Sequence, residues 1–153
     1  MQYWLMKSEP DTYGIDDLER AGKPSMWEGC RNYVVRNYLR DEMQEGDMAF
    51  FHHSNSKPSG IIGTMKIVGQ PYPDPTQFDP NSHYYDPKSP RDKPRWVVRD
   101  VVFERKFKRI ISLDEIRTIP GLEQMGVIRK GNRLSIQKVT PEEWKIILSQ
   151  PGI

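Results

Sequence analysis

The sequence is poor in cysteine and histidine, and this excludes several kinds of site. Its single cysteine, Cys30, allows neither an internal disulfide nor a zinc site built from cysteines. His52 and His53 are neighbours on a predicted strand, so their side chains point to opposite faces and cannot hold one metal ion together. With His83 as the remaining histidine, a metal site would need carboxylates that the spacing does not indicate. We therefore expect no metal and no cofactor.

Long apolar runs are also absent. Hydrophobic residues make up 36% of the chain, and no run approaches the ~18 apolar residues of a membrane span. Residues 1–7 lack a basic start followed by an apolar segment, so no secretory signal is expected. A length of 153 residues fits one domain. We expect a single soluble domain over residues 1–153, located in the cytoplasm and without a membrane partner.

The chain has no large excess of either charge. Lys and Arg number 23 against 21 Asp and Glu, which excludes a polybasic arm or an acidic tail. The basic residues are nevertheless unevenly placed: residues 91–109 hold eight against three acids, and residues 129–138 hold four against none. Together with Arg31, Arg36 and Arg40, these segments could form one basic face for phosphate groups. They could equally be ordinary solvated positions.

Proline, in contrast, is abundant, and seven of the 13 prolines lie between Pro71 and Pro94. Disordered segments are poor in aromatic residues, yet this one holds Tyr72, Tyr84 and Tyr85. We predict a long ordered loop folded onto the body of the protein, as is typical of functional loops of this length. A flexible excursion is the alternative.

Periodicity and capping signals predict an α+β fold with a small, mostly antiparallel, barrel-like sheet. Strands are predicted over residues 3–7, 48–53, 60–68, 96–110 and 134–139, and helices over residues 15–20, 31–43, 112–115 and 140–148. The strand over residues 96–110 is apolar on both faces, so it can bend across a small barrel and change its covered face.

Catalytic motifs are scarce. The chain has no Gly-x-Ser-x-Gly elbow, and Cys30 is more typical of a small buried residue than of a nucleophile. Enzyme activity is therefore the minority interpretation. It would use Glu28 or His53 as an acid–base group on a nucleotide or another small molecule.

Residues 24–33 form the most informative stretch, because they place Trp27 in a short polar loop before a predicted helix N-terminus. Hydrogen-bonding side chains suited to a base edge accompany it at Ser8, Glu28, Asn32, His53 and Ser54. Stacking on an aromatic ring combined with hydrogen bonds to the edge is how proteins hold an unstacked base. The alternative is that Trp27 closes one end of the core, its N–H bonded to a carbonyl.

At these residues the sequence resembles the EVE domain. The resemblance rests on residues 3–11 (YWLMKSEPD), 27–33 (WEGCRNY), 51–54 (FHHS), 72–75 (YPDP), 84–89 (YYDPKS), 94–96 (PRW) and 133–135 (RLS). It implies a PUA-like fold, a small, bent, mostly antiparallel β-barrel flanked by short helices, and kinship with the YTH domain. The chain departs from the family pattern at Gly14, Cys30 and His52, where Ser, Val and Tyr are frequent.

The resemblance also implies a reader of modified bases, with modified cytosine in DNA favoured and RNA an alternative target. Carried over by position, the base pocket comprises Lys7, Ser8, Glu9, Trp27, Gly29, Asn32, Tyr33, His53, Ser54, Trp96, Arg133, Leu134 and Ser135. We predict phosphate contacts from Arg31, Arg36, Arg99, Arg129 and Lys130. The expected protein is a non-catalytic, nucleic-acid-binding reader. A sensor whose proline-rich segment recruits a protein is a further alternative.

Overall fold

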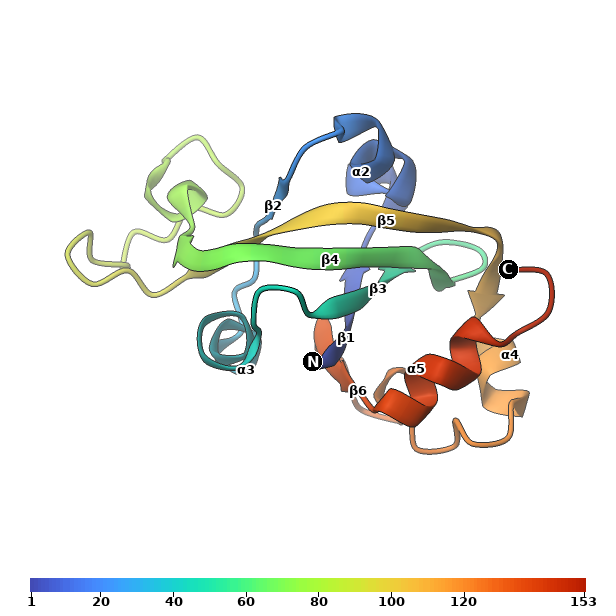
Figure 1. Ribbon diagram of the computed structural model, residues 1–153. Helices are drawn as coiled ribbons and strands as arrows, with labels where there is room; N and C mark the ends of the chain where they lie inside the picture. The colour runs from blue at the N-terminus through green and yellow to red at the C-terminus, as the bar shows by residue number, and fades with distance from the viewer.

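A computed structural model describes residues 1–153, and one six-stranded sheet is its central feature (Figure 1). The strands are β1 (Tyr3–Ser8), β2 (Ser25–Trp27), β3 (Met48–His53), β4 (Gly60–Pro73), β5 (Val97–Ser112) and β6 (Ile136–Val139). Their order is β2-β5-β4-β3-β1-β6, and only β1 and β3 run parallel. The sheet is therefore mostly antiparallel, as predicted. It is bent like a barrel but does not close, since β2 and β6 form its two edges.

Short helices surround this sheet. They are α1 (Pro10–Tyr13), α2 (Ile15–Ala21), α3 (Tyr33–Asn37), α4 (Leu113–Thr118) and α5 (Pro141–Leu148), with a π-helical turn η1 (Tyr38–Glu42) and two 3-10 turns, η2 (Pro75–Phe78) and η3 (Gly126–Ile128). The capping signal before α5 is confirmed. The Thr140 hydroxyl accepts from the Glu143 amide at 3.1 Å, and the Glu143 carboxylate accepts from the Thr140 amide at 2.9 Å. None of the helices is long and apolar enough to cross a membrane.

Two local predictions were wrong near Trp27. Residues 25–27 are a short edge strand paired with β5 and not a loop, and three residues are too few to show a period in the sequence. The predicted helix over residues 31–43 begins at Tyr33, because the Asn32 side chain caps it. Its second half, η1, has π-helical hydrogen bonding.

The bend of β5 divides the core in two. Val101 packs in a first cluster beneath α2 and α3, together with Leu18 and Val35. Phe107 and Ile111, further along the same strand, pack in a second cluster with residues of α4 and α5. The residues between them, 104–106, are exposed. The predicted change of covered face along this strand is confirmed, and it places α4 and α5 at one end of the molecule (Figure 1).

The proline-rich segment, residues 71–94, is ordered and lies at the opposite end (Figure 1). A buried glutamine holds it: Gln77 Nε2 donates to the carbonyls of Asp74 and Trp96 at 2.7 and 2.8 Å. Gln77 Oε1 accepts from the Ser89 hydroxyl at 2.6 Å and from the Trp96 amide at 3.1 Å. One side chain thus joins the start, middle and end of the segment. The prediction of an ordered loop is confirmed for residues 74–94, whereas residues 71–73 are the end of β4.

Candidate nucleic-acid interface

Parallel pairing of β1 and β3 brings predicted pocket residues together. Lys7 lies opposite His52 and Ser8 opposite His53, so the C-terminal ends of both strands lie side by side. The Ser54 amide donates to the Ser8 carbonyl at 2.9 Å, and the Lys7 amide donates to the Ser135 carbonyl at 2.9 Å. We call these residues the strand-end cluster: Lys7, Ser8, Glu9, His53, Ser54 and Ser135.

Trp27 is connected to this cluster through two contacts. The centroids of the Trp27 and Phe51 rings lie 5.5 Å apart in an edge-to-face arrangement. The centroids of the Phe51 and His53 rings lie 5.6 Å apart in the same arrangement. Cys30, three residues after Trp27, is buried in the same first core cluster as Trp27. Burial raises the pKa of Cys30 to about 12, so it is an inert core thiol, as predicted.

The indole N–H of Trp27 distinguishes it from two other tryptophans. The N–H groups of Trp4 and Trp96 donate to the carboxylates of Asp47 and Asp86, at 3.1 and 2.7 Å. Trp27 is only 8% exposed. Its N–H makes no hydrogen bond, and it is not one of the two fully buried polar atoms without a partner, which are His52 Nε2 and Gln137 Oε1. The alternative for Trp27 is therefore confirmed in one half, since the ring packs in the first core cluster, and wrong in the other, since no core carbonyl accepts from its N–H. The donor reaches the surface and is free.

Several other polar groups of the cluster are bonded within the protein. The Ser8 hydroxyl donates to the Tyr13 carbonyl at 2.6 Å, and Ser54 Oγ lies 3.1 Å from Nδ1 of His52. His53 Nε2 accepts from the Ile15 amide at 3.1 Å, which holds the start of α2 and places the imidazole proton on Nδ1. Burial lowers the pKa of His53, so the ring is neutral. Glu9 accepts a hydrogen bond from the Asn55 amide group.

Lys7 is the free cation of the cluster. Its side chain is half-buried, and its ammonium makes neither a hydrogen bond nor an ion pair within the chain. Burial lowers its pKa. Burial, followed by the nearby Lys7 charge, lowers the pKa of His52 to about 4, so His52 is neutral at pH 7. A partly desolvated ammonium without a partner is a strong donor for an acceptor atom of a ligand.

Asn32 has a structural task that the sequence analysis missed, although Asn before a helical pattern is a capping signal. Its Oδ1 accepts from the amides of Val34 and Val35 at 2.8 and 3.2 Å. Its amide NH₂ stays exposed and unbonded, so only its donor side can contact a ligand. On the other side of the cluster, Leu134 packs on the first core cluster and Arg133 is exposed.

Tyr33 and Trp96, also predicted for the pocket, form a separate stack. Their rings lie 5.0 Å apart, with the Arg36 guanidinium 4.7 Å from the Tyr33 ring and that of Arg31 5.5 Å from the Trp96 ring. Trp96 also lines a pocket of about 480 Å³ between the loop after β2 and the proline-rich segment. The lining residues are Gly29, Arg31, His83, Tyr84, Tyr85, Asp86 and Trp96. We call this the Tyr84 pocket.

The prediction that Arg99 contacts phosphate was wrong. Arg99 is 3% exposed, and its guanidinium donates to the carbonyls of Leu39, Met43 and Gly69 at 2.8, 2.6 and 2.9 Å. Burial lowers its pKa. Arg99 therefore ties η1 to the sheet. A charged residue in an apolar strand pattern is the one signal in the sequence that could have indicated a buried role.

Arg31 is likewise committed inside the protein, which corrects its prediction as a phosphate ligand. It pairs with Asp74 at 3.0 Å and donates to the Tyr84 carbonyl from Nε and Nη2, at 3.2 and 2.8 Å. Arg36 is half-buried and bonded to Asn37 Oδ1 at 3.0–3.1 Å. Arg129 and Lys130, in contrast, are exposed and without partners.

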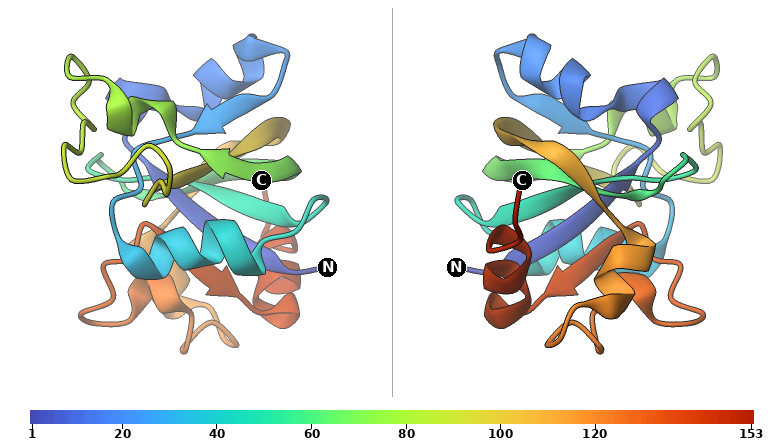
Figure 2. Two further views of the ribbon diagram at one scale, coloured as in Figure 1. Left: turned by 90° about the vertical axis from the view of Figure 1, so that its left-hand side faces the viewer. Right: turned by 90° about the vertical axis from the view of Figure 1, so that its right-hand side faces the viewer.

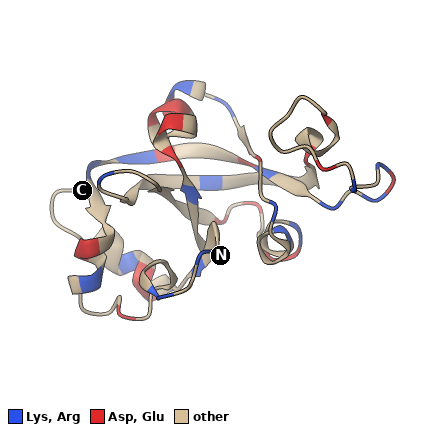
Figure 3. Cartoon of the chain, turned by 180° about the vertical axis from the view of Figure 1, so that it is seen from behind, with Lys and Arg blue, Asp and Glu red and all other residues tan.

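The single basic face does not form (Figure 3). Arg105 and Arg109 of β5 lie towards the far end of the sheet, where they donate to the carbonyls of Ile153 and Pro151, and Lys106 pairs with Asp16. The loop over residues 129–135 and the proline-rich segment remain on the side where α3 begins (Figure 2).

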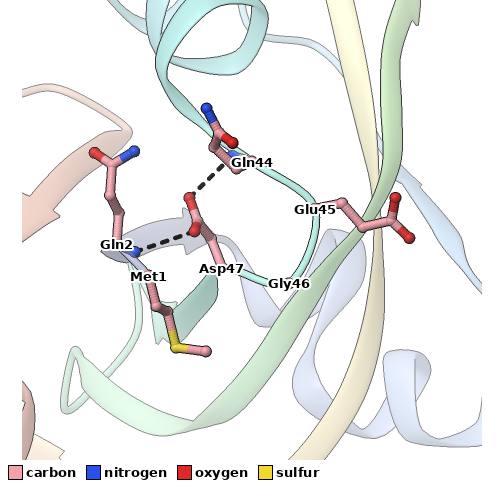
Figure 4. Close-up of a pocket in the computed structure, with 6 residues that line it drawn as sticks. All are labelled: Met1, Gln2, Gln44, Glu45, Gly46 and Asp47. Atoms are coloured by element: carbon pink, nitrogen blue, oxygen red, sulfur yellow. Dashed lines mark hydrogen bonds between the residues drawn. The ribbon is translucent and has the colours of Figure 1, made fainter.

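A further pocket, of about 360 Å³, contains none of the predicted residues (Figure 4). It is lined by Met1, Gln2, Gln44, Glu45, Gly46 and Asp47. The Asp47 carboxylate accepts there from the amides of Gln2 and Gln44 at 3.1 and 2.9 Å and from the Trp4 indole. These hydrogen bonds connect the start of β1 to the turn before β3, at the opposite end of β1 from the strand-end cluster.

A bent, mostly antiparallel sheet flanked by short helices, with polar strand ends beside a tryptophan loop, defines a PUA-like domain. More narrowly, the family model of the EVE domain matches residues 2–150, and the chain belongs to the EVE family. Rat thymocyte nuclear protein 1 is 45% identical over 165 residues, 96% of this chain and 72% of the relative.

Solved structures agree with this assignment. A Pseudomonas syringae protein superposes with a TM-score of 0.91 at 48% identity, over 95% of this chain and 97% of the other. Human THYN1, crystallised in complex with 5-methylcytosine-containing DNA, superposes with a TM-score of 0.89 at 43% identity, over 97% and 96% of the two chains.

Proposed function

We propose that this protein is a non-catalytic reader that binds nucleic acid and holds a flipped or single-stranded modified cytosine beside Trp27. The observation that carries the proposal is the human relative in complex with 5-methylcytosine-containing DNA, which aligns with 97% of this chain. Shared fold alone does not imply shared function, so the local chemistry has to support it as well.

Three free donors support this ligand. The indole N–H of Trp27 lies at the end of β2 and the amide NH₂ of Asn32 lies at the start of α3. The Lys7 ammonium belongs to the strand end that contacts Trp27 through Phe51 and His53. Cytosine presents two adjacent acceptors, O2 and N3, and donors fixed in a partly buried site suit them. The small exposed area of Trp27 makes it the floor of the site, where the base rests against its free edge.

Phosphate contacts then fall to the exposed cations Arg129, Lys130 and Arg133, which have no partners in the protein. Extruding a base costs a few kcal/mol, so affinity must also draw on these contacts and decrease as salt rises. We propose either DNA or RNA as the carrier strand.

The test is fluorescence anisotropy with single-stranded and duplex oligonucleotides that contain one 5-methylcytosine or one cytosine, as DNA and as RNA. Wild type should prefer the modified strand. Trp27→Phe keeps an apolar ring and removes the N–H, and Lys7→Met removes the cation, so each should weaken binding about tenfold, the value of one hydrogen bond to a polar partner.

Trp144→Phe is the matched control, because Trp144 is 7% exposed, close to the 8% of Trp27, and packs in the second core cluster. It should bind like wild type. If Trp27→Phe and Lys7→Met remain folded and bind as tightly as Trp144→Phe and wild type, the proposed pocket is refuted.

An enzyme acting on modified nucleotides is the second candidate. One observation favours it: desolvation, and then the Asp74 carboxylate, raises the pKa of Glu28, although that side chain is exposed. Incubation with modified nucleosides and nucleotides, followed by mass spectrometry, separates the two functions. A product that disappears in Glu28→Gln would support the enzyme, and unchanged substrate supports the reader.

A further inference from the structure

The Tyr84 pocket is a second built site beside the proposed base pocket. Its walls are held in place from three directions. The Tyr84 ring lies directly on Gly29, where an added Cβ would be 2.6 Å from Cζ. Arg31 fixes the Tyr84 carbonyl, and the Trp96 indole donates to Asp86 at 2.7 Å. A pocket whose walls are this constrained is preorganised for a ligand.

The lining favours a flat aromatic ring. Besides Tyr84 and Trp96 it presents His83 and Tyr85, both exposed, the latter at 42%. Exposed aromatic side chains on a rigid segment are stacking platforms for nucleobases.

Aromatic walls also suit a methylated ammonium group, but the charges of this pocket disfavour a cation. The Arg31 guanidinium is part of the wall with its charge paired with Asp74, and the Arg95 guanidinium lies 3.9 Å from the Asp86 carboxylate. The one carboxylate, Asp86, is already bonded to the Trp96 indole and to the Lys88 amide. The adjoining residues 88–95 carry four basic side chains against one acid. An anionic ligand with an aromatic ring fits these features, and a nucleotide has both.

The pocket also stands at the correct distance for a neighbour of the base that is read. Gly29 is two residues from Trp27, and two residues span at most about 7 Å. Successive nucleotides of a strand are about 3.4 Å apart when stacked and further apart when extended. We propose that the Tyr84 pocket binds the base of the nucleotide one or two positions from the modified cytosine, with its phosphate towards residues 88–95. This inference rests on the proposed function.

The test compares His83→Ala/Tyr85→Ala with wild type on single-stranded oligonucleotides. Both side chains are exposed, so the double variant should fold, and circular dichroism checks this. Affinity for the modified strand should fall about tenfold, and the ratio of modified to unmodified affinity should not change. With abasic spacers at the flanking positions, wild type and variant should bind equally. Tyr72→Ala is the matched control, since Tyr72 is 38% exposed and lies outside the pocket.

The two proposals can fail separately. If wild type shows no preference for the modified base but still loses the stacking effect in the double variant, the reader function is refuted and the neighbouring-base site stands. If the double variant binds every oligonucleotide as Tyr72→Ala does, the Tyr84 pocket is not a base site. Loss of binding to a trimethyl-lysine peptide alone, with oligonucleotide binding unchanged, would likewise overturn it.

Discussion

Substitution of Gly29 by alanine tests whether the proline-rich segment is packed on the Trp27 loop. Gly29 has a φ of +85°, and its Cβ would meet the Tyr84 ring at 2.6 Å. Gly46 has a similar φ of +93° but nothing within 4 Å of such a Cβ. The two positions therefore share the backbone cost and differ in the steric one.

The expected magnitudes follow from this difference. A non-glycine residue at positive φ costs about 1–2 kcal/mol, which is the whole effect expected for Gly46→Ala. Gly29→Ala should cost about 1–3 kcal/mol more, because it overpacks a filled space. In a Tyr84→Ala background the extra cost should disappear, since the colliding ring is gone.

Urea unfolding followed by tryptophan fluorescence measures these differences. With a slope of about 1–3 kcal/mol/M, the unfolding midpoint of Gly29→Ala should lie roughly 1 M below that of Gly46→Ala. Equal midpoints for the two glycine variants would show that Tyr84 does not rest on Gly29. A larger decrease that persists without the Tyr84 ring would contradict the steric explanation.

Three further outcomes are expected. Arg99→Met should lower the free energy of unfolding by about 3 kcal/mol or more, because it leaves three carbonyls without their donor, and Arg99→Lys should not restore it because an ammonium lacks the guanidinium fork; thermal unfolding checks both. The pKa of His52 is lowered to about 4 in the folded protein, so the unfolded chain takes up a proton at this residue at higher pH than the folded protein does. The contribution of neutral His52 to stability is therefore complete above the ordinary pKa of histidine and is lost as pH falls from there towards 4. The free energy of unfolding of His52→Phe should depend less on pH in that range, and an unchanged slope would contradict the argument. Asn32→Asp keeps the cap acceptor and removes the amide donor, so stability should hold while oligonucleotide affinity falls severalfold, whereas Asn32→Ala should also lose about 1 kcal/mol of stability.

The parts of the fold that depend on neighbouring residues could be predicted. The capping box of Thr140 and Glu143 closes within four residues, and the face switch along β5 is written in its own pattern of apolar positions. The aromatic residues of the proline-rich segment likewise indicated that it is ordered, although Tyr72 and Tyr85 are exposed. Such signals need no knowledge of where the rest of the chain lies.

The site was predictable only in part, since residue types did not show which polar groups are already used. Asn32 was a plausible base contact, but one face of its amide caps α3. Arg31 and Arg99 were plausible phosphate ligands, but the partners named above lie 30 to 60 residues away in the sequence. Trp27 was ambiguous until its N–H proved to be free.

By itself the sequence determined the α+β class, the absence of a disulfide and the order of most elements, because these follow from composition, periodicity and local capping. The family followed from the resemblance of its motifs to the EVE domain. Only the tertiary structure decided which donors face a ligand. Parallel pairing of β1 with β3 places Lys7 beside His52, and the hydrogen bonds from Arg31 to the Tyr84 carbonyl hold Tyr84 over Gly29. The physical reason is that each polar group can make only a few hydrogen bonds. Contacts between residues far apart in the sequence decide whether those bonds form inside the protein or stay available for a ligand.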